Sequence, residues 1–297
     1  MMTQHNDLQC WRRSAHAKLN LFLSVQNKRA DGFHDILAVN QEISLSDSLV
    51  FTPEPARFTV SVQGNPDVPS DERNLVYKAA KALFADDALP KMRVCVEKTI
   101  PTGAGLGGGS SDAAATLSFF NSHFGINKPL DELIAIAKSV GSDVPFALMG
   151  GTALVSGVGE KIQRLPEPQE PVWFVVAAPT VSVSTGHAYR WIDEQQDRTP
   201  APQPDQLIHS LLDRDLESLA RHLHNDFEQV ILKRHPQIGN LKQALLDAGA
   251  LGALMTGSGS NVFAVVRSQD HAELVKRRIT GCCSACWVAH SVPFSAR

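Results

Sequence analysis

The sequence lacks an excess of positive charge. Its 297 residues carry 28 lysines and arginines against 31 aspartates and glutamates, a formal net charge of −3. Without a bulk positive field, binding to a phosphate polymer or to an acidic membrane surface is disfavoured. We therefore expect that the protein binds no nucleic acid and no membrane.

Cysteine is also scarce, with five residues in the chain. Cys282, Cys283 and Cys286 lie together, whereas Cys10 and Cys95 are isolated. An odd number in this arrangement does not suggest a disulfide framework and favours a reducing cytoplasm. A zinc site at the cluster would need four ligands, so free buried thiols are favoured over a metal.

Long apolar runs are missing as well. One long uncharged stretch, residues 144–159, contains Pro145 and four glycines and is unsuitable as a membrane span. The first seven residues lack the charged start and apolar stretch of a secretion signal. A content of 43% apolar residues instead predicts a sizeable buried core in a cytoplasmic protein.

Glycine is ordinary in number but concentrated in one place. Five of the seven residues from Gly103 to Gly109 are glycine. Alternation over residues 92–97 predicts a strand before them, and helical spacing over residues 112–124 predicts a helix after them. Glycine amides that line a concavity, followed by a helix amino terminus, form a cradle for phosphate.

Three other interpretations of this loop are weaker. A Walker loop ends in Gly-Lys-Ser or Gly-Lys-Thr, but here the glycines are followed by Ser110, Ser111 and Asp112. A dinucleotide fingerprint needs a following strand with an acidic residue about 20 positions on, and here a helix begins near Pro129 instead. The remaining alternative is a flexible turn of small residues.

Helices and strands mix along the whole chain, which predicts an α+β protein. Strict alternation over residues 15–25 predicts a strand, and Asn74 to Phe84 has helical spacing. A polar run with three prolines over residues 160–171 indicates a boundary. We expect an N-terminal domain at residues 1–160 and a C-terminal domain at residues 161–297.

Four motifs in register resemble those of the GHMP kinases, the superfamily of galactokinase, homoserine kinase and mevalonate kinase. They are the loop Pro101-Thr102-Gly103-Ala104-Gly105-Leu106-Gly107-Gly108-Gly109-Ser110-Ser111, together with residues 17–23, 30–34 and 141–146. The resemblance covers residues 14–263 and implies the two-domain GHMP kinase fold, with the active site in the cleft between the domains. It is strongest to the branch that uses ATP to phosphorylate the 2-hydroxyl of a cytidine-diphosphate-linked methylerythritol in non-mevalonate isoprenoid biosynthesis. The alternatives are a homoserine or mevalonate type of kinase, or a regulator that binds a nucleotide without chemistry.

The resemblance also implies roles for individual residues. The loop from Pro101 to Ser111 would wrap the triphosphate of ATP, with Ser111 as a ligand of Mg²⁺. Asn74 and Lys98 would lie on the adenine side, and their alternatives are a helix cap for Asn74 and a solvated charge for Lys98. Lys18 and Asp143 would form the catalytic pair, and their alternatives are an exposed strand lysine and a helix cap.

For the second substrate, the resemblance implies a site for cytosine. His34 would bind the base by hydrogen bonds, Phe33 and Tyr189 would stack on it with Thr185 nearby, and Asn20 would bind the erythritol or its diphosphate. Core packing is the alternative for the two aromatic residues. Two positions depart from the family pattern, because Phe33 replaces a tyrosine and His16 replaces a proline. The glycine turn at residues 255–261 resembles the third of the superfamily's own motifs, called the third motif below, which packs against the phosphate loop.

Overall fold

The computed structural model describes residues 10–85, 87–195 and 198–294. Its contacts divide the chain into two compact units, neither of which is a single stretch of sequence. The first unit comprises residues 1–15, 46–100 and 108–148, and the second comprises residues 16–45, 101–107 and 149–297. Strands β1 (Trp11–Lys28) and β2 (His34–Pro53) run through both units. The expected domain boundary near residue 160 divides the sequence into two consecutive stretches, whereas each compact unit is built from several segments. That domain boundary stays a prediction.

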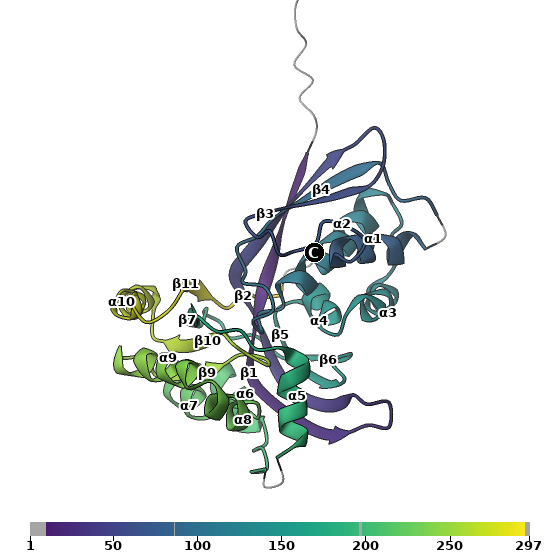
Figure 1. The fold of residues 1–297 in the computed structure, drawn as a ribbon. Helices are drawn as coiled ribbons and strands as arrows, with labels where there is room; N and C mark the ends of the chain where they lie inside the picture. Colours follow the sequence, from purple (N-terminus) through teal and green to yellow (C-terminus); the bar gives the residue numbers. More distant parts are fainter. Residues whose placement is uncertain (1–9, 86, 196–197, 295–297) are drawn as a thin grey trace, which may run out of the picture. The chain divides into compact units, whose positions relative to one another are not determined.

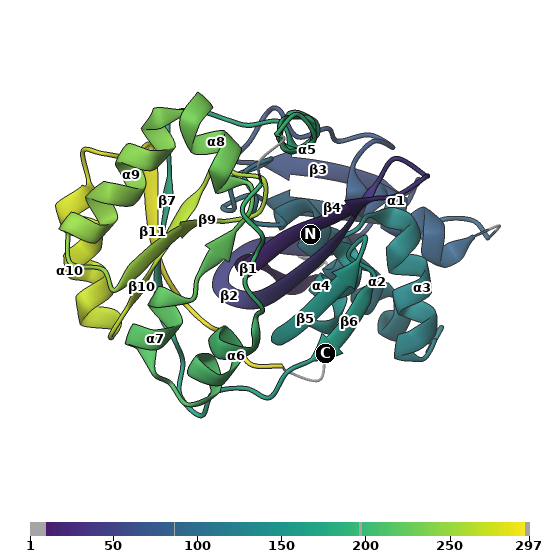
Figure 2. The same cartoon turned by 90° about the horizontal axis from the view of Figure 1, so that it is seen from below.

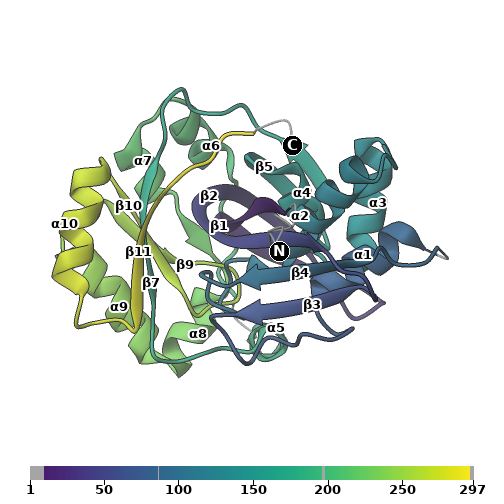
Figure 3. The same ribbon diagram turned by 90° about the horizontal axis from the view of Figure 1, so that it is seen from above.

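The first unit packs helices against short strands. Its own elements are β3 (Thr59–Gln63), α1 (Leu75–Phe84), β4 (Met92–Glu97), α2 (Gly108–His123), α3 (Leu130–Val140) and α4 (Val144–Met149). Strand β4 lies between β3, which is parallel to it, and residues 48–53 of β2, which are antiparallel (Figure 3). Helices α1, α2 and α3 contact one another (Figure 1). Their apolar faces form a core in which Phe51 stacks on Phe119 with ring centroids 4.0 Å apart.

The second unit contains a separate sheet with the strand order β11-β7-β10-β9. Its elements are β5 (Thr152–Gly157), β6 (Lys161–Arg164), β7 (Trp173–Ala178), α5 (Thr185–Asp193), α6 (Asp205–Leu212), α7 (Leu216–Arg221), β8 (His224–Asn225), α8 (Glu228–Arg234), α9 (Pro236–Asp247), β9 (Gly252–Met255), β10 (Val262–Val266), α10 (Gln269–Ile279) and β11 (Ala285–His290). The four strands are antiparallel, and helices α9 and α10 pack on them (Figure 2). Strand β5 pairs with residues 36–41 of β2, and β8 pairs with β1.

Several elements confirm the predictions that were made from the periodicity of the sequence. The strand expected at residues 92–97 is β4, and Asn74 caps α1 by accepting a hydrogen bond from the Val76 amide at 2.9 Å. The helix expected from residue 112 begins earlier, at Gly108, so the last two glycines of the cluster belong to its first turn. Strand β1 is buried on both faces from residue 17 to 25, although its alternation predicted one polar face. No helix among the described residues is both long and apolar enough to traverse a bilayer.

Candidate active site

The glycine loop is held against strand β1 within the second unit. Gly103, Gly105 and Gly107 have positive φ angles of 63°, 83° and 70°, a backbone conformation that side chains rarely allow. A Cβ on Gly105 would lie 2.1 Å from the carbonyl oxygen of Thr256, so the loop touches the glycine turn at residues 255–261 directly. The Lys18 amide donates a hydrogen bond to the Leu106 carbonyl at 3.0 Å. The contact expected between the third motif and the phosphate loop is therefore present.

The loop continues into the first turn of helix α2, which belongs to the first unit. Ser111 is buried in that turn. A Cβ on Gly108 would lie 2.9 Å from Cγ2 of Ile100, so the helix approaches the strand end too closely for any side chain there. The first amide groups of this 16-residue helix have no carbonyl partner within the helix, and the helix dipole places a partial positive charge at this end. Both favour a phosphate group at this end of the helix.

A buried ionic cluster supports the start of α2. The Lys98 ammonium contacts carboxylate oxygens of Asp47 and of Asp112, the latter at 2.8 Å, and all three side chains are almost fully buried. The other Asp47 oxygen accepts hydrogen bonds from the amides of Thr99, at 2.5 Å, and Ile100, at 2.8 Å. Asp47 therefore ties the end of β4 to β2, and the alternative of Lys98 as a solvated charge is wrong.

The pKa of Asp112 is raised to about 7, chiefly by burial and also by the Asp47 carboxylate, against the opposing effect of Lys98. The pKa of Lys98 is raised, because the two carboxylates outweigh the burial that would lower it. Two carboxylates that share one ammonium in a dry site cannot both ionise easily. Sequence reasoning missed Asp47 and Asp112, although a charged residue directly after Ser110-Ser111 was a visible signal for the second.

Lys18 and Asn20 lie side by side on β1 in the second unit. The Lys18 ammonium donates to Oδ1 of Asn20 at 2.6 Å, and the Asn20 amide group donates to Oδ1 of Asn40 at 2.6 Å. Both predicted residues are buried, with 6% and 4% of their surface exposed, so the alternative of an exposed strand lysine is wrong. Asn40, on β2, is a further member of this polar row that the sequence did not single out.

Asp143 directly precedes helix α4, and its carbonyl accepts the Ala147 amide at 3.0 Å. It lies at the helix start that the sequence predicted. Asp143 belongs to the first unit and Lys18 to the second. The pairing of the two side chains stays a prediction, as does the contact of Asn74 and Lys98 with adenine.

The residues expected to bind cytosine gather in the second unit. The His34 and Tyr189 rings stack with centroids 5.1 Å apart and an angle of 24° between their planes, and Phe227 packs edge-on against Tyr189 at 5.0 Å. Phe33 is 66% exposed in the turn between β1 and β2, which rules out core packing for this aromatic residue. Thr185 contacts the hydroxyl of Ser258 in the glycine turn at 2.8 Å.

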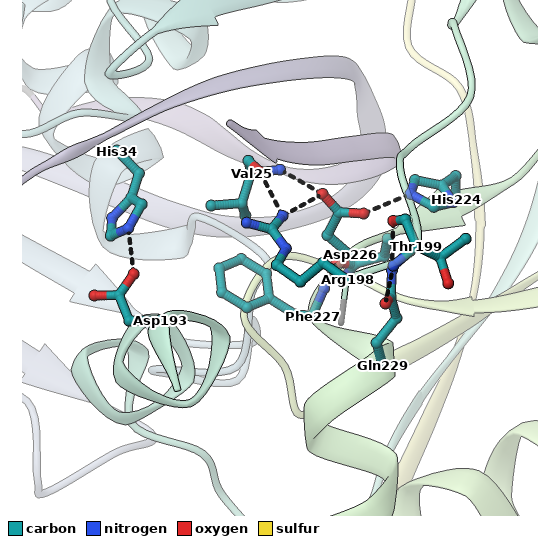
Figure 4. Close-up of polar contacts among 10 residues, drawn as sticks. Val25, His34, Asp193, Arg198, Thr199, His224, Asp226, Phe227 and Gln229 are labelled. Carbon is teal, nitrogen blue, oxygen red and sulfur yellow. Dashed lines mark hydrogen bonds and ion pairs between the residues drawn. The ribbon is translucent and has the colours of Figure 1, made fainter. Parts of the chain in front are cut away.

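Asp193 is the residue of this cluster that sequence reasoning missed. Its Oδ1 lies 2.7 Å from Nε2 of His34, and Figure 4 shows the carboxylate at the end of α5 facing the imidazole. Thr185, Tyr189 and Asp193 are spaced by four residues on α5 and therefore share one helix face. That spacing was the signal available in the sequence.

The cysteines form no disulfide in the described part of the chain. All five cysteines, which lie within it, are free thiols, and burial raises the pKa of Cys286 to about 12. Within residues 10–85, 87–195 and 198–294, no group of three or more histidine, cysteine, aspartate or glutamate side chains is arranged to hold a metal ion.

Comparisons with known proteins agree with the architecture. The model of the GHMP kinases N terminal domain matches residues 74–151, and that of the GHMP kinases C terminal matches residues 207–285. A 4-diphosphocytidyl-2-C-methyl-D-erythritol kinase of Symbiobacterium thermophilum is 41% identical over 93% of this chain and 98% of its own length. The protein of the same name from Exiguobacterium sibiricum is 40% identical over 92% of this chain and 95% of its own.

Solved structures give the same result. A crystal structure of 4-(cytidine 5'-diphospho)-2C-methyl-D-erythritol kinase has a TM-score of 0.78 and 32% identity, covering 94% of this chain and 98% of the other. A homoserine kinase from Cytophaga hutchinsonii, 20% identical with a TM-score of 0.72 over 99% and 98% of the two chains, shares the fold. The expected α+β GHMP kinase fold and the phosphotransferase class are confirmed. The chain belongs to the 4-diphosphocytidyl-2-C-methyl-D-erythritol kinase family of the GHMP kinases.

Proposed function

We propose that this ATP-dependent kinase transfers the γ-phosphoryl group of ATP to the 2-hydroxyl of 4-diphosphocytidyl-2-C-methyl-D-erythritol. The names of its relatives support this substrate. The observation that carries the proposal within the molecule is the attachment of the glycine loop to β1. The amide of Lys18 bonds the loop at Leu106, so the strand that fixes the phosphate cradle also carries the buried Lys18 and Asn20 side chains.

The chemistry requires an alcohol oxygen in line with the γ-phosphorus. That oxygen forms a bond to phosphorus, the bond from the γ-phosphorus to the bridging oxygen of ADP breaks, and the hydroxyl proton passes to the Asp143 carboxylate. Lys18 stabilises negative charge on the transferred group and on the carboxylate. Because Asn20 accepts a hydrogen bond from the Lys18 ammonium at 2.6 Å, the ammonium has a fixed direction before substrate binds.

On the nucleotide side, the amides from Pro101 to Ser111 hold the triphosphate. We propose that Asn74 and Lys98 lie near adenine and act indirectly, because their side chains hold the neighbouring backbone in place. Asn74 caps α1 and also donates to the Pro69 carbonyl at 2.6 Å, and the Lys98 ammonium is engaged by Asp47 and Asp112.

Mg²⁺ fits this end of the molecule. In nucleotide sites the ion takes one or two protein oxygens and completes its shell with phosphate and water. The buried Ser111 hydroxyl, at the first turn of α2, would hold it. Oδ1 of Asp112 on the next residue is buried without a hydrogen-bond partner among the described residues, and a cation bound nearby would favour the ionised form of this carboxylate. When bound, the ion neutralises charge on the β- and γ-phosphates.

On the acceptor side, Phe33 and Tyr189 stack on cytosine, His34 bonds its edge, and Thr185 and Asn20 hold the diphosphate and the erythritol. The free thiols fit a reducing compartment, and we propose that the enzyme works in the cytoplasm.

Release of ADP with each acceptor tests this function. We expect turnover with the cytidyl substrate and none with mevalonate or homoserine. Asp143→Asn should lower kcat by about 10²- to 10⁴-fold, because the variant cannot accept the hydroxyl proton. Asp131→Asn, an exposed carboxylate of the same unit, is the matched control and should leave kcat unchanged.

A wild type that releases ADP only with mevalonate or homoserine would contradict the substrate. Full activity of Asp143→Asn would contradict the role of this carboxylate, while leaving the substrate assignment intact. A protein that binds ATP without releasing ADP with any acceptor would indicate a regulator instead.

A further inference from the structure

Asp193 lies where it can control which nitrogen of His34 carries a proton. The carboxylate receives two contacts, one from each side of the turn at residues 29–33. Its Oδ1 lies 2.7 Å from Nε2 of His34, the first residue of β2, and its Oδ2 lies 2.5 Å from Nζ of Lys28, the last residue of β1. The His34 side chain is 5% exposed, so water competes little for this hydrogen bond.

The carboxylate is held in its ionised form. Burial works against ionisation, but the hydrogen bonds and charges of Lys28 and His34 keep the pKa of Asp193 below its ordinary value. An ionised carboxylate only accepts hydrogen bonds, so the proton in this contact belongs to Nε2 of the imidazole. In the neutral ring, Nδ1 is then an acceptor.

The position of the ring is fixed as well as its proton. Tyr189, one helical turn before Asp193, stacks on His34, and Phe227 supports Tyr189 from its edge. Among the described residues, the structure gives Nδ1 of His34 no hydrogen-bond partner, whereas Nε2 is taken by Asp193 (Figure 4). Nδ1 is therefore the ring nitrogen left for a ligand.

We propose that Asp193 is a positioning residue for base specificity: by holding the proton of His34 on Nε2, it makes Nδ1 an acceptor that selects a base with an amino group. Cytosine offers a 4-amino donor, whereas uracil presents an oxygen at the same position. An acceptor facing that oxygen leaves two buried lone pairs opposed, which is costly. The inference rests on the proposed function, because it assigns the base recognised by the same site.

The test compares kcat/KM for the cytidyl substrate and for its uridyl analogue. Without the carboxylate, in Asp193→Ala, the proton of His34 is no longer held on Nε2. We therefore expect the ratio of kcat/KM for the cytidyl substrate to kcat/KM for the uridyl analogue to fall by about tenfold, as is common when a hydrogen-bond partner of a ligand-binding histidine is removed. The KM for ATP should stay unchanged. Lys28→Met removes the other contact of the same carboxylate, and Glu194→Gln removes a neighbouring charge that pairs with Arg234. Neither control should change the preference.

A purely mechanical role for Asp193, as a clamp on the turn, would make Lys28→Met and Asp193→Ala lower the preference equally, and this result would overturn the proposal. An unchanged preference in Asp193→Ala would do the same. A measurement on the unmodified chain is independent of how the variants fold. Long-range ¹⁵N–¹H spectra at about pH 8, above the ordinary pKa of histidine, should show His34 protonated on Nε2, and protonation on Nδ1 would overturn the proposal. If the wild type uses neither substrate, the proposed function fails, while the spectrum still judges the tautomer.

Discussion

At the scale of single residues, Asp47 and Asp112 have different surroundings in the buried cluster that they form with Lys98. The sequence alone does not distinguish the two carboxylates. Asp47 accepts two backbone amides besides the Lys98 ammonium. Asp112 has one oxygen on Lys98 and one without a partner among the described residues. Both oxygens of Asp47 thus accept hydrogen bonds, whereas the pKa of Asp112 is raised to about 7 mainly by burial. Neutralisation should therefore cost much more stability at Asp47 than at Asp112.

We expect Asp47→Asn to lower the free energy of unfolding by about 3 kcal/mol, because its NH₂ group would face either the Lys98 ammonium or the two backbone amides, each of which is itself a donor. Asp112→Asn should cost less than about 1 kcal/mol at neutral pH, because the variant resembles the protonated form that burial favours. Denaturant unfolding of both variants measures the difference. Equal losses would contradict the distinct roles of the two carboxylates.

The pH dependence has a definite sign. The folded chain keeps the Asp112 proton up to about pH 7, whereas the unfolded chain loses it near the ordinary pKa of 3.8. The folded state therefore binds more protons between these values, and stability falls as the pH rises through that window, by about 4 kcal/mol. Asp112→Asn should remove this part of the slope. An unchanged slope in the variant, measured by denaturant unfolding across the window, would assign the loss to other groups.

At the scale of elements, the glycine loop depends on two different properties of glycine. Gly105 has both a positive φ and no room, since its Cβ would meet the Thr256 carbonyl at 2.1 Å. Gly103 also has a positive φ, but nothing lies within 4 Å of its Cβ position. Comparing the two alanine variants separates backbone strain from the contact with the glycine turn.

Gly105→Ala should raise the KM for ATP by about tenfold or more, because the loop must move away from Thr256 in addition to bearing strain of about 1–2 kcal/mol. Gly103→Ala bears only the strain, and its KM should rise less than about threefold. Initial rates of ADP release at varied ATP measure both values. A similar KM in the two variants would show that the contact with Thr256 does not set the position of the loop.

The same elements show how far the sequence leads. Periodicity was sufficient for β4 and for α1 with its Asn74 cap, because these depend on local pattern. It placed the start of α2 too late, since glycine is a poor helix former and only the close approach to Ile100 explains Gly108 in a helix. The cluster around Lys98 and the pair of His34 and Asp193 join residues distant in the sequence. Burial of Lys18 likewise depends on what packs over β1, which alternation along one strand does not encode.

At the scale of the whole molecule, the two compact units share strands β1 and β2. Strand β2 pairs with β4 through residues 48–53, in the first unit, and with β5 through residues 36–41, in the second. Because both pairings use one continuous strand, we expect the unfolding of one unit to disturb the strand pairing of the other. This continuity predicts one cooperative unfolding transition in spite of the division of contacts.

Tryptophan fluorescence can test that cooperativity. Trp11 belongs to the first unit, where it contacts Phe119 and His123, whereas the other three tryptophans belong to the second. Trp11→Phe then reports on the second unit, and a variant that keeps only Trp11 reports on the first. In each variant the midpoint of denaturant unfolding by fluorescence should coincide with that by far-ultraviolet circular dichroism, because one transition moves both signals. Comparing the two signals within each variant cancels any change in stability caused by the substitutions. If the Trp11 signal changes at a lower denaturant concentration than the dichroism, the first unit unfolds alone, and the shared strands do not couple the two units.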